Sequence, residues 1–290
     1  DEGYLIGNPG RGVTSVQFPT GATPPGFPTP RPKRQYDALE LGYSRRFSGN
    51  WFFSANYTLS RLYGNYSGLA SSDEITTPTT GGTSATAQQQ AGSIARPGGN
   101  ANRAWDLDEL LWDSRGNLDV RGRLATDRPH VVKLYGSYDL PWGTQIGAFF
   151  YGGSGTPIST YVTSTQSADL FVNGRGDMGR TPALTRTDLL VSQEVRLPAT
   201  KRLRFELNVT NLFNQKTARH IFNYLNKGAI IPDRSSSFID LSDVDLSKGY
   251  DYRALINATT DGANAYDPRY GMPDLFEDGT RGFVTVKFLF

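Results

Sequence analysis

Gly282-Phe-Val-Thr-Val-Lys-Phe-Leu-Phe290 is the stretch that decides the fold. Side chains of an extended strand alternate between its two faces. One face therefore carries only apolar residues, namely Val284, Val286, Phe288 and Phe290. Such an aromatic carboxyl-terminal strand is common in bacterial outer-membrane β-barrels, where the apolar face meets lipid. It also fits a core strand of a soluble β-sandwich, so the rest of the chain has to separate the two.

The composition narrows the class of protein. The chain has 290 residues, of which 37% are hydrophobic and 12% aromatic, and it is rich in Gly. A modest apolar share with many aromatics suits a transmembrane barrel, in which every second strand residue is polar. A net charge of +2 gives no nucleic-acid footprint. The absence of Cys excludes disulfides, thiolate metal sites and a Cys nucleophile.

The same alternation recurs upstream and is clearest from Trp51, where Trp, Phe, Ala, Tyr and Leu alternate with Ser, Asn and Thr. Strands of roughly 9–11 tilted residues span a bilayer. The pattern predicts seven strands, over residues 36–47, 51–63, 129–140, 144–152, 184–197, 203–213 and 282–290.

The connections between these strands are of two kinds. Three are tight turns, at Ser48-Gly49-Asn50, Pro141-Trp142-Gly143 and Pro198-Ala-Thr-Lys201. The others are long loops, over residues 64–128, 153–183 and 214–281, and residues 1–35 form a Gly/Pro-rich loop or linker. Short periplasmic turns and long extracellular loops are typical of outer-membrane barrels. We therefore predict an all-β, antiparallel transmembrane β-barrel segment of about seven strands with long extracellular loops.

Charged residues at the polar strand positions indicate which face is wet. Arg or Lys on the lipid face would cost roughly 2–4 kcal/mol near the midplane. We therefore expect these side chains to face a lumen or a plug. They are Glu40, Lys133, Arg204 and Glu206. The alternative is the solvent face of a soluble antiparallel sheet, which shows the same alternation.

Aromatic residues in the long loops are the candidate ligand contacts, because exposed aromatics suit peptides or glycans. They are Trp105, Trp112, Tyr161, Phe171, Tyr224 and Tyr252. The alternative is that they pack the loops against one another. Trp51 and Trp142 border short turns and are expected in the interfacial aromatic girdle.

Nothing in the sequence predicts an enzyme, a metal site or a cofactor. The histidines, His130 and His220, have no Gly-x-Ser-x-Gly elbow to support a triad. The acidic groups at 106, 108 and 109 and at 240, 243 and 245 match no calcium loop.

Two internal stretches carry a family resemblance. Leu203-Arg-Phe-Glu-Leu-Asn-Val-Thr-Asn-Leu-Phe-Asn214 resembles the late-strand motif of TonB-dependent outer-membrane transporters. Asp127-Arg-Pro-His-Val-Val-Lys-Leu-Tyr-Gly-Ser-Tyr-Asp-Leu-Pro-Trp-Gly143 resembles a strand-turn pattern of that family, and the last strand resembles its closing strand. The chain is most similar to the Oar-like subgroup, which has an amino-terminal carboxypeptidase-regulatory-like domain.

The resemblance implies a plugged barrel of about 22 strands that imports a scarce ligand with energy delivered through TonB. Seven strands cannot close such a barrel, so we expect the chain to be its carboxyl-terminal part. The implied partners are outer-membrane lipid, the rest of the barrel and its plug, the TonB complex and the barrel assembly machinery. The alternatives are a surface receptor or scaffold without transport, and a secreted β-sandwich. The sandwich predicts that a second sheet buries the face that carries Trp51, Phe53, Tyr57 and Val284.

Overall fold

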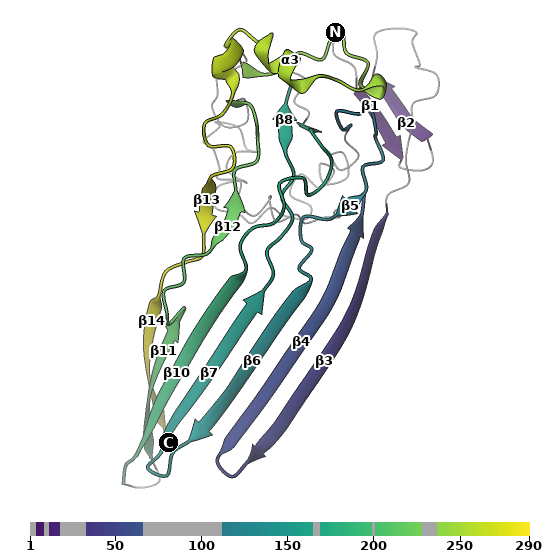
Figure 1. Cartoon of the computed structure of the whole chain (residues 1–290). Helices are drawn as coiled ribbons and strands as arrows, with labels where there is room; N and C mark the ends of the chain where they lie inside the picture. The colour runs from purple at the N-terminus through teal and green to yellow at the C-terminus, as the bar shows by residue number, and fades with distance from the viewer. Residues whose placement is uncertain are drawn as a thin grey trace.

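The computed structural model describes residues 4–8, 12–17, 33–65, 112–164, 169–198, 201–227 and 237–290. These residues form a long, tilted antiparallel sheet with a compact assembly of loops at one end (Figure 1). The carboxyl terminus lies at the opposite end of the sheet, beside the short turns (Figure 1). The expectation of an all-β, antiparallel fold is confirmed.

Seven long strands make up the main path of the sheet in the order β14-β11-β10-β7-β6-β4-β3. Each of them overlaps one range expected from the sequence. Their bounds are β3 (Arg34–Ser48), β4 (Trp51–Gly64), β6 (His130–Asp139), β7 (Thr144–Gly153), β10 (Leu184–Arg196), β11 (Arg202–Thr210) and β14 (Arg281–Leu289). The two-residue β5 (Gly122–Arg123) pairs with the end of β4.

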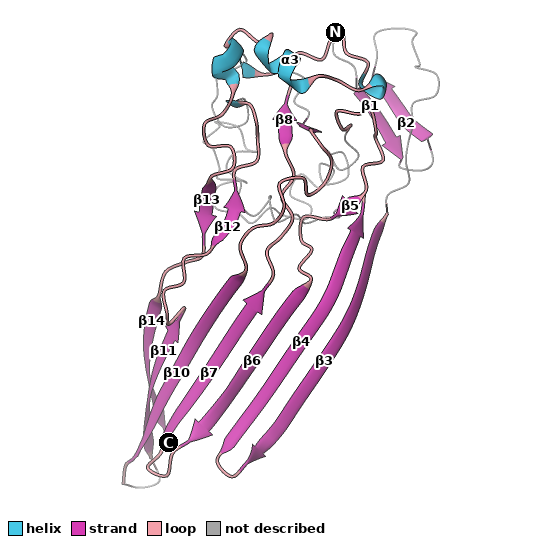
Figure 2. Ribbon diagram, viewed as in Figure 1, coloured by secondary structure: helices cyan, strands magenta, loops and turns pink. Residues whose placement is uncertain are grey.

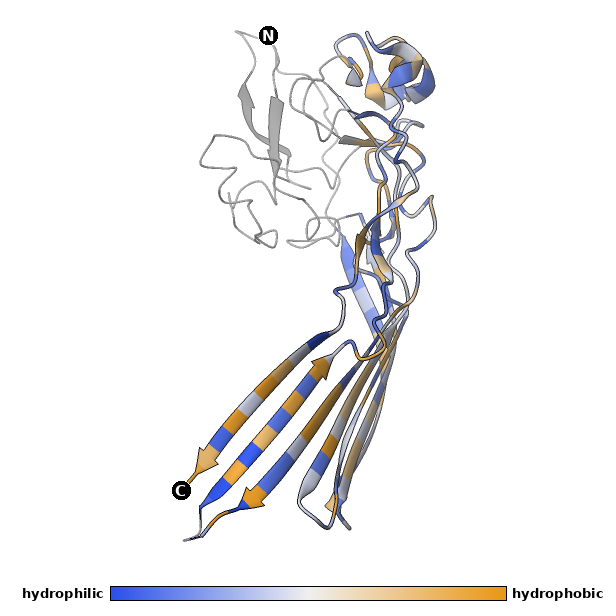
Figure 3. Cartoon of the chain, turned by 90° about the vertical axis from the view of Figure 1, so that its left-hand side faces the viewer, coloured by the Kyte–Doolittle hydropathy of each residue, from blue (hydrophilic) through white to orange (hydrophobic). Residues whose placement is uncertain are grey.

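The register gives the sheet one apolar face. Residues that pair across strands share a face, so the chain of pairs can be followed from β4 to β14. One such row consists entirely of apolar residues, namely Trp51, Tyr138, Ile146, Val191, Leu207 and Val284. Hydrophobic and hydrophilic residues alternate visibly along the strands in Figure 3.

The apolar face lies open in the described part of the chain. Val284 is 76% exposed, Val286 is 56% exposed and Phe288 is 50% exposed. The soluble β-sandwich required a second sheet to bury this face, and the described residues place no sheet over it. The fold therefore does not support the sandwich.

Two turns show how the sequence sets the strand ends. Gly49 and Asn50 both have positive φ, 60° and 69°, between the paired residues Ser48 and Trp51. This is the two-residue hairpin geometry that favours Gly and Asn. Asn211 has φ 49° and ends β11 at Thr210, three residues before the expected end at 213.

The long connections contain regular structure of their own (Figure 2). Two small antiparallel strand pairs lie there, β8 (Tyr161–Thr163) with β9 (Asp169–Phe171) and β12 (Ala218–Ile221) with β13 (Pro273–Phe276). The α-helix α3 (Tyr252–Asn257) follows η4 (Leu246–Lys248) and precedes η5 (Gly262–Ala265). Residues 1–35, expected to be a loop or linker, contain the hairpin β1 (Tyr4–Asn8)–β2 (Gly12–Gln17).

The buried core of the molecule lies in these loops rather than in the sheet. We call it the loop core; it consists of Val162, Leu170, Val172, Ile239, Tyr250, Ile256 and Ala265. Half-buried residues such as Trp112, Leu225 and Tyr252 pack against it. Two connections far apart in the sequence thus form one core, and Trp112 from a third packs against it. Among the described helices, none is long and apolar enough to cross a membrane.

Candidate functional site

The four residues expected to face a lumen lie on one face of the sheet. Glu40 pairs with Thr58, and Lys133 pairs with Asn56 two residues away on the same strand. Asp139, on the same strand face as Lys133, pairs with Gln145, Gln145 pairs with Ser192, and Ser192 pairs with Glu206. Glu206 therefore lies on this face too. Arg204 is two residues from Glu206 and therefore shares its face. The alternation read from the sequence thus groups these charges correctly, and their assignment to a lumen stays a prediction.

Side chains on this polar face form a charge ladder across five strands, defined here by Lys287, Glu206, Arg204, Gln145 and Asp139. Lys287 Nζ lies 2.8 Å from Glu206 Oε2, and Arg204 Nε lies 3.1 Å from Glu206 Oε1. Arg204 Nη2 donates to Gln145 Oε1 at 3.2 Å, and Gln145 Nε2 donates to Asp139 Oδ1 at 2.8 Å. Arg204 pairs directly with Lys287, and Glu206 contacts both, so its carboxylate offsets the repulsion between the two cations.

A hollow of about 740 Å³ adjoins this ladder at the short-turn end of the sheet. Polar side chains dominate its lining, among them Asp139, Gln145, Ser192, Glu194 and Arg204. Such a surface offers both hydrogen-bond donors and acceptors. It can therefore bind water or another polar protein surface.

Three of the loop aromatics predicted as ligand contacts contact each other. The Tyr161 ring lies 4.9 Å from the Phe171 ring and 5.6 Å from the Tyr224 ring, measured between centroids. Phe171 is only 1% exposed, so its side chain belongs to the interior. Trp112 and Tyr252 are half-buried against the loop core, and Trp105 lies outside the described residues. This arrangement matches the packing alternative for the described members of the set.

Buried polar residues fix the loops around these aromatics. The Asn226 side chain is fully buried, accepts a hydrogen bond from Thr163 N at 2.9 Å and donates to Thr163 O and Ser237 O. Tyr250 Oη donates to Phe171 O at 2.5 Å. Burial raises the pKa of Tyr250, with Asp113 adding to the effect, so the phenol stays protonated as a donor.

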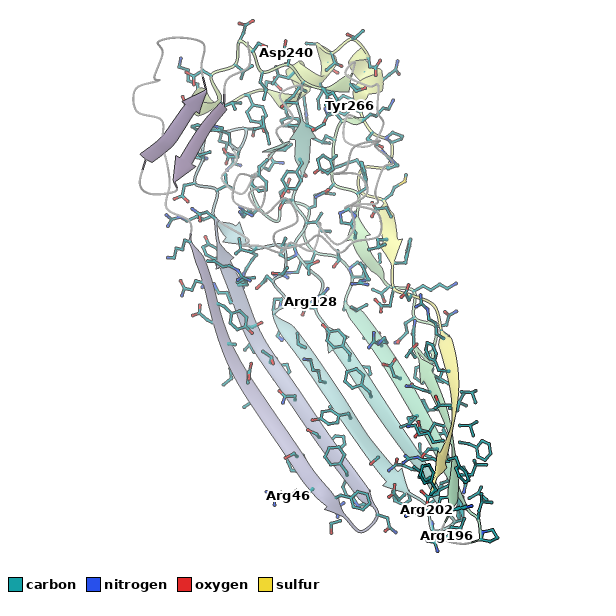
Figure 4. The ribbon with its side chains drawn as sticks, turned by 180° about the vertical axis from the view of Figure 1, so that it is seen from behind. Arg46, Arg128, Arg196, Arg202, Asp240 and Tyr266 are labelled. Atoms are coloured by element: carbon teal, nitrogen blue, oxygen red, sulfur yellow. The ribbon has the colours of Figure 1, made fainter. Side chains whose placement is uncertain are left out.

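The Asp127-Arg128-Pro129 stretch joins the loops to the sheet. The fully buried Asp127 carboxylate accepts a hydrogen bond from Leu62 N at 2.6 Å and forms an ion pair with Arg180. Arg180 Nη1 also donates to Asp127 O and Gly155 O at 2.9 and 2.8 Å. Burial lowers the pKa of Arg128 at the top of β6, as does the nearby Arg219 (Figure 4). The sequence drew attention to Asp127 but gave no sign of its partner Arg180.

A turn built on Asn211 likewise joins a loop to the sheet, at the other side of the sheet. Asn211 Nδ2 donates to Gln215 O and Asp278 O at 3.0 and 2.7 Å, and Thr280 Oγ1 donates to Asn211 O at 2.6 Å. The turn therefore holds the start of β14 against the end of β11. This gives a physical reason for the Asn-Leu-Phe-Asn sequence at positions 211–214.

The histidines and acidic groups weighed earlier take local structural contacts. Tyr57 Oη lies 2.8 Å from His130 Nδ1, and His220 Nδ1 lies 2.5 Å from Asp274 Oδ1. Asp240 and Asp245 accept hydrogen bonds from Ser242 and Ser247 within their own turns. The described residues hold no group of three or more His, Cys, Asp or Glu side chains arranged for a metal. Positions 106, 108 and 109 lie outside the described residues.

Comparison with known proteins gives the family. The chain is similar to the TonB-dependent transporter Oar of Myxococcus xanthus, with 32% identical residues over 217 aligned positions. The alignment covers 73% of this chain. The chain is a TonB-dependent receptor-like protein. This confirms the resemblance seen in the strand motifs, including the Oar-like subgroup.

The match covers only part of the relative. The chain spans 17% of the length of Oar, so it corresponds to one portion of that relative. No family model matches the chain, and no solved structure matches it.

Proposed function

We propose that this chain is the strand-and-loop portion of an outer-membrane receptor that binds a scarce ligand and imports it through TonB. The apolar face of the sheet contacts lipid, and the polar face with its charge ladder lines the lumen or contacts a plug. The loop assembly stands outside the cell and takes part in ligand capture.

The observation that carries this proposal is the separation of the two faces. Six apolar residues share one row from β4 to β14, and the neighbouring polar row crosses the sheet with ion pairs and amide hydrogen bonds. In hydrocarbon, exposed apolar side chains cost nothing, and each strand between β14 and β3 has a hydrogen-bonded neighbour on both sides. The kinship with a TonB-dependent transporter supports the same assignment.

The asymmetric connections suggest which end faces outward. In barrels of this kind the short turns face the periplasm and the long loops face the exterior. The turn at Gly49 and Asn50, the turn at 140–143 and the facing ends of β10 and β11 lie at one end, and the loop core lies at the other (Figure 1). We propose that the loop core provides a rigid platform, on which the outward surfaces of the loops contact the ligand.

Labelling of single cysteines tests the orientation, because this chain contains no Cys. Lys248 in the loop assembly has an 81% exposed side chain, and Lys201 lies exposed in a short turn. In the full-length protein on intact cells, Lys248→Cys should react with a membrane-impermeant maleimide. Lys201→Cys should react only after the outer membrane is permeabilised.

The opposite labelling pattern would reverse the orientation. Reaction of both variants in the soluble culture supernatant, with none in the membrane fraction, would instead make the chain a secreted protein. The same variants labelled with a permeant maleimide serve as the control for side-chain reactivity.

Coupling to TonB separates a transporter from a surface receptor. The periplasmic domain of TonB can be titrated against the full-length protein in nanodiscs by surface plasmon resonance. Saturable binding supports energised import. Absence of binding under conditions where a known TonB-dependent transporter binds would favour the receptor or scaffold without transport.

A further inference from the structure

A hollow of about 310 Å³ opens on the apolar face of the sheet. Small residues form its floor, because Gly136 on β6 pairs with Ala148 on β7. Larger apolar side chains form its walls, namely Phe53, Leu134, Tyr138, Ile146 and Phe150. The lining is almost wholly apolar, so a hydrocarbon chain fits its chemistry.

The hollow is complete within this chain. It lies over β4, β6, β7 and β10, each of which has a hydrogen-bonded neighbour on both sides. Strands that join the sheet at its edges, β3 and β14, would not alter it. A void beside well-packed walls forfeits dispersion contacts. An ordered apolar occupant would restore them.

A cation lies on the same face, one strand beyond the hollow. Arg45 pairs with Phe53, which is also a wall of the hollow, and its Cζ lies 3.5 Å from the centroid of the Trp51 ring. Arg45 Nη1 is buried and has no hydrogen-bond partner. A buried guanidinium N–H without an acceptor is unfavourable. A phosphate oxygen is the acceptor that a guanidinium suits best.

The cation and the hollow are spaced for one lipid. Arg45 and Gly136 flank Phe53 on either side, so their backbones are two strand spacings, or roughly 10 Å, apart. Arg45, Phe53, Gly136 and Ala148 lie in one row of paired residues, so the hollow lies beside Arg45 across the strands. A phosphate held at Arg45 therefore leaves an acyl chain within reach of the hollow.

Other basic residues mark the same end of the sheet. Arg46 lies at one side of the sheet, and Arg196 and Arg202 lie at the other (Figure 4). Arg202 forms an ion pair with Glu194, while Arg46 and Arg196 are exposed. Arg196 pairs with Arg202 on the polar face, so these two do not belong to the site on the apolar face.

We propose that Arg45, Trp51 and the hollow over Gly136 and Ala148 form a binding site for a glycerophospholipid. The phosphate accepts hydrogen bonds from Arg45, and one acyl chain fills the hollow. The proposal rests on the outer-membrane placement given above and adds to it a specific lipid of the leaflet at the short-turn end.

Photolabelling tests the site. The full-length protein is reconstituted in dioleoylphosphatidylglycerol bilayers that contain a trace of phosphatidylglycerol with a diazirine on one acyl chain. After irradiation, the labelled peptides are mapped by mass spectrometry. Labelling of Tyr138 to Phe150 should exceed that of the strands β11 and β14, which present the same apolar face without the hollow.

Two variants and a matched control test whether the excess labelling depends on Arg45 and on the hollow. Arg45→Gln should lower the excess labelling about tenfold, because it removes charge-assisted hydrogen bonds, and Ala148→Trp should abolish it by filling the hollow. Arg46→Gln, which removes the neighbouring exposed Arg, should leave it unchanged. If Arg45→Gln fails to fold, Arg45→Lys and Ala148→Trp carry the test, and Arg45→Lys should keep part of the excess.

The possible results separate this site from the proposed function. Even labelling along the whole apolar face, or an excess that survives both Arg45→Gln and Ala148→Trp, would overturn the lipid site and leave the membrane placement intact. Absence of label from the apolar face altogether would overturn the placement and the lipid site together.

Discussion

The sheet and the loop assembly bury their apolar residues in opposite ways. In the loop core, Val162, Ile239 and Ile256 are fully buried by the chain itself. In the sheet, Leu41 and Val286 are more than half exposed although their strands are regularly paired. The loop assembly thus carries its own hydrophobic core. The apolar face of the sheet, in contrast, is left uncovered by the described part of the chain.

From this difference we assign the loop assembly to water and the apolar face of the sheet to lipid. Apolar burial contributes roughly 25 cal/mol per Å² removed from water. The loop assembly gains this from contacts among its three connections. The sheet gains it only when lipid covers the apolar face, and its backbone ladders stay satisfied there. Changes in one region should therefore leave the other folded.

The largest effect is expected from Ile256→Ala in α3. Removal of a fully buried Ile side chain should destabilise the loop assembly by about 2–5 kcal/mol. Hydrogen exchange of the full-length protein in nanodiscs should show faster exchange in residues 112–127, 158–172 and 237–270. The amides of β6 and β7 should stay protected, and Asn257→Ala, at an exposed position of the same helix, should change neither region. Equal loss of protection in the sheet would show that the two regions do not fold independently.

Adjacent leucines in β10 provide a matched comparison of the two faces. Leu189 pairs with Ala148 and Val209 on the apolar face, and Leu190 pairs with Gly147 and Asn208 on the polar face. Leu189→Arg should cost about 2–4 kcal/mol if the face meets hydrocarbon near the midplane. Leu190→Arg should cost far less. Equilibrium unfolding from phospholipid vesicles measures both, and equal costs would remove the distinction between the faces.

Asn211 lies where the two regions meet, so its replacement should weaken the contact between the loop assembly and the sheet. Asn211→Ala removes the hydrogen bonds to Gln215 and Asp278 and places at φ 49° an Ala, which adopts the left-handed region less readily than Asn. We expect a loss of about 1–3 kcal/mol, seen as faster exchange at the start of β14. Asn211→Gly tolerates the backbone conformation and should lose less. A greater loss in the Gly variant would show that the backbone conformation is not what Asn211 supports.

The smallest expected effect is a pH dependence confined to the loop assembly. Burial alone would raise the pKa of Asp267, but hydrogen bonds from Arg269 outweigh it and hold this pKa below its usual 3.8. A carboxyl with a depressed pKa in the folded state stabilises the protein above its unfolded pKa. That stability is lost as the pH falls through the lower folded value. Exchange near Asp267 should therefore accelerate below about pH 4, and Asp267→Asn should remove this component.

The sequence predicted the sheet well because a strand of a membrane barrel is a local pattern. Alternation of period two assigns each side chain to a face, and Gly49-Asn50 is a turn signal that needs no distant partner. The group of Glu40, Lys133, Arg204 and Glu206 on one face followed from this rule alone.

The loop core was beyond such rules. Its members come from two connections separated by many residues, and their spacing follows neither a strand nor a helix period. Phe171 gave the same signal as an exposed ligand-binding aromatic, because burial against Tyr161 and Tyr250 depends on tertiary contacts. The partners of Asp127 and Asn226 are equally distant in sequence.

The most direct test of the account measures the surroundings of positions 189 and 190 in the intact protein. Single-cysteine variants of the full-length protein carry a nitroxide at each position in phospholipid bilayers, and accessibility to oxygen and to a water-soluble nickel complex is compared. The account predicts that the label at 189 is accessible mainly to oxygen, because it lies in hydrocarbon, and that the label at 190 is not. High accessibility of position 189 to the nickel complex would contradict a lipid-facing sheet.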